Sequence, residues 1–251
     1  MLPNRFRSGC QIMTKRLFGI LLALVPTLAL GAGGVSLQSS QINPNDLASQ
    51  QRGAALFMNY CSGCHSLGFQ RYSRTAEDLG LTEEQVMGNL VFNDAKFGEH
   101  MTSSMTAKDG ERWFGKAPPD LSLVARAKLG GPDWTYTFLK SFYADESRPS
   151  GWNNTVLAGA SMPHVLWELQ GVQRPIIGSN GSVEKLELAS QGKQSVAEYD
   201  QTVRDLTNFL HYVAEPSAAK RRSVGLWVIL FLSVFTILAW MLKKEYWRDV
   251  H

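Results

Sequence analysis

Apolar residues recur at helical spacing in the segment that ends at Tyr60, and this pattern predicts an amphipathic helix. Its apolar stripe consists of Leu47, Ala54, Leu56, Phe57 and Tyr60. Asn45 or Asp46 can cap the N-terminus, because a short polar side chain there accepts a hydrogen bond from a free backbone N–H group. Gly53 lies within the helix, and its missing side chain would let another element approach the backbone closely.

A second amphipathic helix is predicted to end just before Pro216. Its stripe consists of Val203, Leu206, Phe209, Leu210 and Val213. Two starting points are open, because Ser195 can form a capping box with Glu198 and Asp200 is also a good N-cap.

Shorter helices are predicted between these two. One starts at Thr82, which forms a capping box with Gln85. Another starts at Asp120 and ends at Gly130-Gly131, and a third runs from Asp133 through Trp134, Phe138 and Phe142. Residues 174–192 are rich in Gly, Ser and polar side chains, so we expect a loop there. Because alternating strand patterns are sparse, the expected fold class is mainly α.

The C-terminal part of the chain contains an uncharged run from Val224 to Leu242. As a helix, 19 residues span about 28 Å, close to the roughly 30 Å of a bilayer's hydrocarbon core. Basic residues flank the run on both sides, including Lys220 and Lys243. This pattern predicts one C-terminal transmembrane helix rather than a buried core helix.

A shorter apolar stretch near the N-terminus has the layout of a secretory signal peptide. Lys15 and Arg16 precede Leu17–Leu30, which contains Pro26 and ends at the small residues Gly31-Ala32. We therefore predict a cleaved signal peptide over residues 1–32, an exported domain over 33–216, and an anchor with a short tail over 217–251. The leader would place the domain in the periplasm and the tail in the cytoplasm, with one pass through the inner membrane.

Removing the leader and the anchor reverses the charge of the chain, which is +3 as a whole. Ten of the 25 basic residues and two of the 22 acidic residues belong to the two ends, so 15 basic and 20 acidic residues remain. A domain charge of about −5 argues against nucleic acid as a partner and favours a basic one. Glu77, Asp78, Glu83 and Glu84 form an acidic cluster that can contribute to docking or can simply be solvated.

The exported domain contains the run Cys61-Ser62-Gly63-Cys64-His65, the C-x-x-C-H pattern of covalent c-type haem attachment. Two thiols at this spacing reach one edge of a porphyrin, and the adjacent imidazole reaches its iron. A redox pair would need a thioredoxin-like context, and a zinc site would need two more ligands, whereas no cysteine follows Cys64. The motif therefore predicts one covalently attached haem c.

The second axial ligand of the iron has several possible sources, namely Met87, Met101, Met105, Met162, His100, His164 and His211. Met162 is favoured because small residues precede it and Pro163 pushes its backbone toward an extended conformation. His164 is the main rival and would give a bis-histidine haem of lower potential. His100, Met101 and Met105 lie in a polar stretch that we expect to be exposed.

The motifs, taken in chain order, resemble those of the cytochrome c1 family, the haem subunits of cytochrome bc1 complexes. Cys61–Arg74, which reads CSGCHSLGFQRYSR, is similar to the family's haem segment, and Ala117–Ser122 is similar to its A-P-P-D-L-S run. Arg126–Gly131 follows with basic residues and a Gly-Gly pair. Ala160–Pro163 resembles the methionine-ligand loop, and Phe209–Pro216 resembles the junction with a single anchor.

The resemblance implies a fold and a set of site residues. The fold would be a class I type cytochrome c domain with insertions, followed by the transmembrane helix. His65 and Met162 would be the axial ligands, Pro119 would pack at the haem, and a basic residue from Arg126 to Lys128 would lie near a propionate. Lys128 stands where the family has an arginine, so a bidentate clamp is not expected there.

The implied function is electron transfer within the respiratory chain. The chain would accept an electron from a Rieske iron–sulfur protein beside cytochrome b and pass it to a soluble or membrane-tethered cytochrome c. It would be part of ubiquinol–cytochrome c reductase, with no separate catalytic site of its own. The alternative is a monohaem subunit of another respiratory oxidase or dehydrogenase. A peroxidase or gas sensor would need an open sixth position, against which Met162 argues.

Overall fold

A computed structural model of the chain describes residues 36–179 and 181–248, and within them the expected mainly α fold is confirmed. The helices are α2 (Leu47–Tyr60), α3 (Tyr72–Leu79), α4 (Glu83–Asn89), α5 (Ala107–Phe114), α6 (Val124–Ala127), α7 (Pro132–Lys140), α8 (Trp167–Gln170), α9 (Val196–Ala214) and α10 (Ala218–Tyr246). The strands are β1 (Leu67–Arg71), β2 (His100–Met101), β3 (Phe142–Ala144), β4 (Trp152–Asn154), β5 (Gly171–Ile177) and β6 (Val183–Gln191). They pair as three two-stranded antiparallel sheets, β1–β2, β3–β4 and β5–β6.

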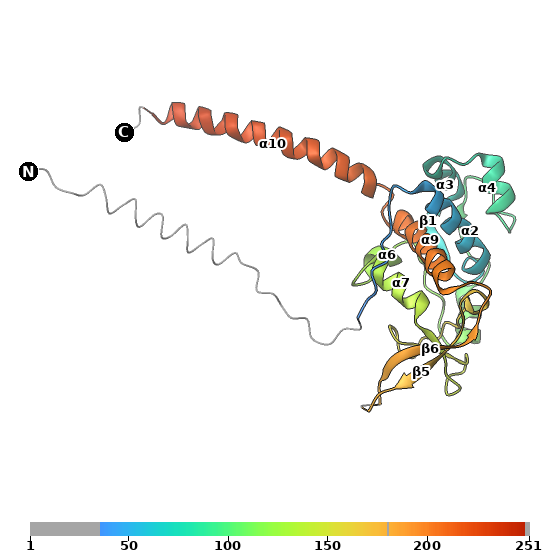
Figure 1. Ribbon diagram of the computed structural model, residues 1–251. Helices are drawn as coiled ribbons and strands as arrows, with labels where there is room; N and C mark the ends of the chain where they lie inside the picture. Colours follow the sequence, from blue (N-terminus) through green and yellow to red (C-terminus); the bar gives the residue numbers. More distant parts are fainter. Residues whose placement is uncertain (1–35, 180, 249–251) are drawn as a thin grey trace, which may run out of the picture. The chain divides into compact units, whose positions relative to one another are not determined.

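The core of the domain forms where α2 packs against α9, two helices far apart in the sequence (Figure 1). The predicted α9 stripe is buried throughout, and Phe209 contacts Phe57 of α2 with ring centroids 6.0 Å apart. Gly53 lies at the contact, where an added Cβ would collide with the Asp205 carbonyl oxygen and lie 2.6 Å from Phe209 Cβ. The close approach expected at Gly53 is thus observed, with α9 as the approaching element.

A buried carboxylate fastens the same two helices. Asp205 of α9 is 3% exposed and accepts hydrogen bonds from Ser49 Oγ at 2.7 Å and Arg52 Nε at 2.6 Å, both on α2. Gln201 Nε2 donates to the same carboxylate from the preceding turn of α9. A buried charge is costly unless it is paired and hydrogen-bonded, and Asp205 satisfies both conditions. The network therefore fixes the position of α9 along α2.

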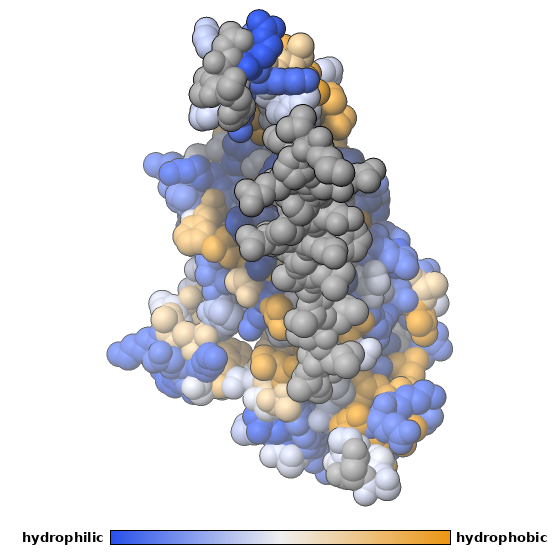
Figure 2. All heavy atoms as spheres, turned by 90° about the vertical axis from the view of Figure 1, so that its left-hand side faces the viewer, coloured by the Kyte–Doolittle hydropathy of each residue, from blue (hydrophilic) through white to orange (hydrophobic). Residues whose placement is uncertain are grey.

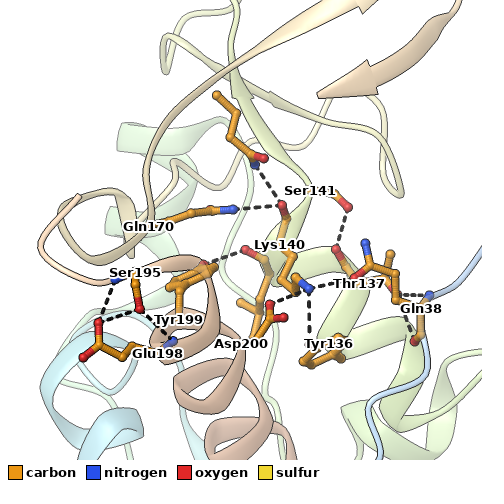
Figure 3. A network of polar contacts seen from close by, with 12 residues as sticks. Gln38, Tyr136, Thr137, Lys140, Ser141, Gln170, Ser195, Glu198, Tyr199 and Asp200 are labelled. Atoms are coloured by element: carbon orange, nitrogen blue, oxygen red, sulfur yellow. Dashed lines mark hydrogen bonds and ion pairs between the residues drawn. The ribbon is translucent and has the colours of Figure 1, made fainter. Parts of the chain in front are cut away.

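A second polar network surrounds Lys140 at the end of α7 (Figure 3). Its ammonium group lies 2.6 Å from Asp200 Oδ1 on α9 and donates to Gln38 Oε1 at 2.8 Å. Its backbone carbonyl accepts from the Gln170 side chain of α8 and from Gln173 of β5. One residue thus links the segment before α2, helices α7, α8 and α9, and the β5–β6 hairpin.

Most of the helix boundaries follow the local signals. Asp46 caps α2, and the capping box of Thr82 and Gln85 is present at α4. Of the two starts proposed for the last helix of the domain, Ser195 is the observed N-cap, with the full capping box to Glu198. These signals act over three residues, so the surrounding fold does not need to be known to read them.

Three of the expected elements need correction. The helix expected from Asp133 through Phe142 ends at Lys140, and Phe142 begins β3. Asp120 starts no helix, because its carboxylate accepts from the backbone of Gly68 and Ser122, and α6 begins only at Val124. The expected loop over 174–192 is the greater part of the β5–β6 hairpin, whose strands pair from Gly171 with Gln191 onward. Most of its side chains are exposed, so neither face carries the apolar stripe that would have marked a strand.

Helix α10 contains the predicted membrane segment. The stretch Ser223–Tyr246 is long and apolar enough to cross a bilayer, and its most apolar window is 0% buried. Among the residues coloured on the face shown in Figure 2, hydrophilic ones predominate, and hydrophobic ones lie in scattered patches. The signal peptide predicted for residues 1–32 lies outside the described residues.

Candidate haem site

The C-x-x-C-H run forms one tight turn at the C-terminal end of α2. Cys61 is the C-cap residue of the helix, and its carbonyl oxygen accepts from the N–H groups of Cys64 at 3.0 Å and His65 at 2.8 Å. Cys61 is buried and Cys64 is partly buried, and both thiols are free. The end of the helix thus presents two thiols and an imidazole, from positions 61, 64 and 65, within one turn.

His65 is oriented by a residue 54 positions away. Its Nδ1 lies 2.7 Å from the carbonyl oxygen of Pro119, and because a carbonyl can only accept, Nδ1 carries the proton. Burial lowers the pKa of His65, and the Pro119 hydrogen bond offsets this only in part, so the ring is neutral at pH 7. The remaining nitrogen, Nε2, therefore keeps its lone pair available for a metal.

The loop that carries Pro119 is attached to the haem-motif segment by three further contacts. Gly68 N donates to Asp120 Oδ2 at 2.7 Å, Phe69 N donates to Ser122 Oγ at 3.1 Å, and Leu121 N donates to Ser66 O at 2.9 Å. Ser122 is fully buried, and a Cβ on Gly68 would lie 2.9 Å from the Asp120 carboxylate. The A-P-P-D-L-S segment, residues 117–122, thus lies alongside residues 66–69 and holds the Pro119 carbonyl against the His65 ring.

The environment of the two thiols does not suit a redox pair. Burial raises the pKa of the Cys61 thiol to about 12 and also raises that of Cys64. A redox-active cysteine depends on a lowered pKa, because the thiolate is the reactive form. Within residues 36–179 and 181–248, no group of three or more His, Cys, Asp or Glu side chains could hold a metal ion, so a zinc site is not supported either. Two free thiols beside an oriented imidazole fit a covalently held haem.

Met162 lies in the loop between β4 and α8 and packs, partly buried, against the hydrophobic core. Met101, expected to be exposed, is 2% exposed, and its Sδ lies 3.5 Å from Thr75 Oγ1. Met87 is partly buried, and so are His100 and Met105, which were also expected to be exposed. The correction at Met101 arises because β2 pairs with β1, a long-range contact that the polar neighbours of Met101 do not reveal.

His164, the rival of Met162, is enclosed by aromatic side chains and is 2% exposed. Its ring stacks on Phe142 with centroids 5.0 Å apart and planes 4° from parallel, and it meets the Trp152 ring edge-on at 5.2 Å. Burial lowers the pKa of His164 to about 4. The imidazole therefore belongs, in neutral form, to the packing beneath the loop.

The two basic residues expected near a propionate both have partners within the protein. Arg126 lies 3.5 Å from Glu215, the residue that ends α9, and Glu215 also pairs with Arg221 in the first turn of α10. The Lys128 ammonium lies over the Trp134 ring, 4.7 Å from its centroid. The structure thus brings His65 and Pro119 together, and it places Arg126 near the junction of α9 with α10 and Lys128 against α7.

Sequence reasoning missed the residues that hold the Met162 loop. Asn153 Oδ1 accepts from Gly159 N at 2.8 Å, and Arg148 Nη2 donates to Gly159 O at 2.8 Å. Asn154, fully buried, accepts from the N–H groups of Val156 and Leu157. The adjacent asparagines before a small-residue loop were the one local signal, because asparagine side chains favour turns by bonding to nearby backbone groups.

Comparison with known proteins agrees with this site. The sequence profile of the Cytochrome C1 family matches residues 38–250. The chain is 48% identical to a cytochrome c1 of Allochromatium vinosum over 95% of this chain and 100% of that protein. It is 43% identical to a Nitrosomonas europaea protein named ammonia monooxygenase gamma subunit, over 94% and 97%, and 28% identical to a cytochrome c1 of Rhodospirillum rubrum, over 92% and 95%. The chain therefore belongs to the cytochrome c1 family of haem-carrying electron-transfer subunits.

Proposed function

We propose that this chain accepts one electron from a Rieske iron–sulfur protein and passes it to a cytochrome c, as the haem subunit of a bc1 complex. The observation that carries the proposal is the hydrogen bond between His65 Nδ1 and the Pro119 carbonyl, beside two free thiols in the same turn. The family match supports the assignment to this complex. A bound haem supplies the one-electron redox chemistry, and the chain supplies its position and its electrostatic surroundings.

Each site residue has a defined task in this proposal. Cys61 and Cys64 would hold the haem covalently, each by addition of its S–H across one vinyl group, with sulfur bonding to one carbon and hydrogen to the other. His65 would hold the iron through Nε2, with its ring oriented by the Pro119 carbonyl. Met162 would hold the iron through its thioether, and a thioether ligand favours reduced iron and raises the potential.

The proposed placement is the inner membrane, with the haem domain in the periplasm and α10 as the single anchor. The exposed apolar stretch of α10 supports the anchor, and the leader pattern over residues 1–32 supports export. Intact-mass analysis of the purified protein should show one haem adduct and loss of about the first thirty residues. A mass without haem, or with two, would contradict the proposal.

Purification of the detergent-solubilised complex tests the proposed partners. The expected companions are a cytochrome b and a Rieske protein, and the isolated complex should reduce a cytochrome c when quinol is added. The name of the Nitrosomonas relative supplies the competing outcome. Co-purification with monooxygenase subunits in place of cytochrome b would overturn the assignment to a bc1 complex.

The axial ligand is tested by substitution at Met162 and at His164. Met162→Leu should abolish the sulfur-to-iron charge-transfer band of the oxidised protein in the far red and lower the reduction potential. His164→Phe should leave that band in place, because a phenyl ring preserves the stacking on Phe142 and offers no nitrogen to the iron. If the band is present after Met162→Leu, or is lost only in His164→Phe, Met162 is not the ligand.

A further inference from the structure

The Met162 loop is fixed on both sides of the methionine by one small element, the β3–β4 hairpin. On the N-terminal side, both polar groups of the Gly159 backbone are engaged by the hairpin. Asn153 Oδ1 accepts from Gly159 N, and Arg148 Nη2 donates to Gly159 O, each at 2.8 Å. Gly159 has φ +74°, a left-handed conformation that glycine adopts without strain. The turn three residues before Met162 is therefore held through its backbone.

On the C-terminal side, the hairpin holds the loop by ring packing. His164 stacks on Phe142 of β3 and meets Trp152 of β4 edge-on, and it is almost fully buried between them. Pro163 lies between this anchor and Met162 and fixes its own φ angle. Only Ala160 to Pro163 span the two anchored points, so the backbone at Met162 has little freedom left.

The hairpin itself is braced, which makes it a rigid support. Asn153 Nδ2 donates to Asp145 Oδ2 at 2.8 Å, and Asp145 also accepts from Ser147 at the turn. These hydrogen bonds lower the pKa of the Asp145 carboxyl, so it stays ionised at neutral pH. Asn154 Nδ2 donates to Phe138 O of α7, which ties the hairpin to the helix layer.

We infer that the β3–β4 hairpin is the positioning device for the Met162 thioether, with Arg148 and Asn153 as positioning residues that act through Gly159. The inference rests on the proposed role of Met162 as an axial ligand. A ligand loop that is already ordered loses less conformational entropy when its sulfur binds the iron. The sulfur–iron bond is therefore stronger than it would be if the same thioether lay on a flexible loop. Weakening the hold on Gly159 should therefore weaken the bond between sulfur and iron.

The experiment follows the charge-transfer band of the oxidised, full-length holoprotein while the pH is raised until the thioether is displaced. Arg148→Met removes the donor to Gly159, and losing a hydrogen bond to a charged group should favour displacement by about tenfold. For a one-proton transition, the midpoint would then fall by about one pH unit. Asn153→Ala removes the other contact and should shift the midpoint in the same direction.

Two variants separate positioning from general effects on the fold. Arg148→Lys keeps the positive charge but not the guanidinium that reaches Gly159 O, so its midpoint should lie between those of Arg148→Met and wild type. Loss of charge alone predicts the wild-type midpoint for Arg148→Lys. Glu146→Gln changes an exposed residue of the same turn and should leave the midpoint at the wild-type value. Haem content and far-UV circular dichroism are measured for every variant, and Asn153→Ala is the independent variant if Arg148→Met does not fold.

Failure of this inference is distinguishable from failure of the proposed function. If Met162→Leu abolishes the band while Arg148→Met and Asn153→Ala both keep the wild-type midpoint, the ligand is correct and the positioning role is wrong. If Met162→Leu leaves the band intact, the ligand assignment fails and the hairpin has no sulfur to position. A lowered midpoint in both hairpin variants, with an intermediate midpoint in Arg148→Lys, supports the inference, whereas a wild-type midpoint in Arg148→Lys would assign the effect to charge and overturn it.

Discussion

Asp120 shows how a single carboxylate can organise a binding site that it does not itself enter. Its two oxygens accept from Gly68 N and Ser122 N, each at 2.7 Å, one on the haem-motif segment and one in its own loop. Pro119 is the preceding residue, so the position of its carbonyl oxygen over His65 depends on this attachment. The orientation of the His65 imidazole thus depends on the backbone of the Pro119 loop, which the Asp120 carboxylate holds in place.

Asp120→Ala should therefore loosen the loop and destabilise the domain. Two hydrogen bonds from backbone N–H groups to a carboxylate are lost, which we expect to cost about 1–3 kcal/mol. Urea unfolding of the holoprotein, followed by haem absorbance, measures the change. Asp120→Asn keeps one acceptor oxygen and should fall between wild type and alanine. Asp94→Ala, at an exposed position, should stay within about 0.5 kcal/mol of wild type; equal losses for Asp120 and Asp94 would contradict the role.

At the residue scale, local patterns predicted what depends on near neighbours. Cys61, Cys64 and His65 form one turn, so their spacing alone indicates their use. Asp120 was interpreted as a helix cap because its residue type suits one, but Gly68 lies 52 positions away and competes for the carboxylate. Met101 was misjudged for the same reason, since its burial depends on the pairing of β1 with β2. Long-range partners decide such cases, and no window of sequence contains them.

At the scale of elements, the contact between α2 and α9 combines apolar packing with a buried polar network. Both helices were predicted, because their stripes repeat at helical spacing and their caps are local. The sequence predicted a close approach at Gly53, but it did not indicate which element would approach. The structure shows that this element is α9. The β5–β6 hairpin was missed because its side chains face solvent on most positions, which leaves no alternation to detect.

Gly53→Ala should weaken the helix contact even though alanine favours a helix more than glycine does. The added methyl group would collide with the Asp205 carbonyl oxygen, so the helices must separate, and overpacking of this kind costs about 1–3 kcal/mol. Denaturant unfolding should show a lowered midpoint. Gly88→Ala in α4 is the matched control, because nothing lies within 4 Å of its added Cβ. That variant should be unchanged or stabilised by up to about 1 kcal/mol, and the same gain at Gly53 would rule out the tight contact.

At the scale of the whole molecule, the acidic domain predicted over residues 33–216 suits a basic electron acceptor, and the structure reduces the number of acidic residues that can take part in docking. Asp78 accepts from Arg74 Nε and from the Tyr212 hydroxyl, so its charge is already used within the domain. Glu83 and Glu84 are exposed in the first turn of α4. Of the predicted acidic cluster, Asp78 is therefore engaged within the domain, whereas Glu83 and Glu84 remain available at the surface.

Reversing Glu83 and Glu84 to lysine should flatten the salt dependence of electron transfer to a basic cytochrome c. Docking charges act mainly on the encounter rate, and the Debye length shrinks from about 30 Å at 0.01 M salt to about 10 Å at 0.1 M. Stopped-flow rates over this range, under conditions where association limits the reaction, measure the slope. The haem spectrum should not change. An unchanged slope would contradict a docking role for the two glutamates and would mean that they act only in the first turn of α4.

Among the residues that the structure describes, the hydrophobic core lies in the domain before α10, and the apolar window of α10 takes no part in it. The apolar window of α10 is 0% buried, so a chain stopped after Pro216 loses no core packing. Glu215 would lose its exposed partner Arg221 but keep Arg126, so the end of α9 remains tied to α6. We expect the truncated chain to be exported, to take up haem and to remain in the supernatant after ultracentrifugation. If it still sediments with membranes after a carbonate wash, while the full-length chain behaves identically, α10 is not the anchor.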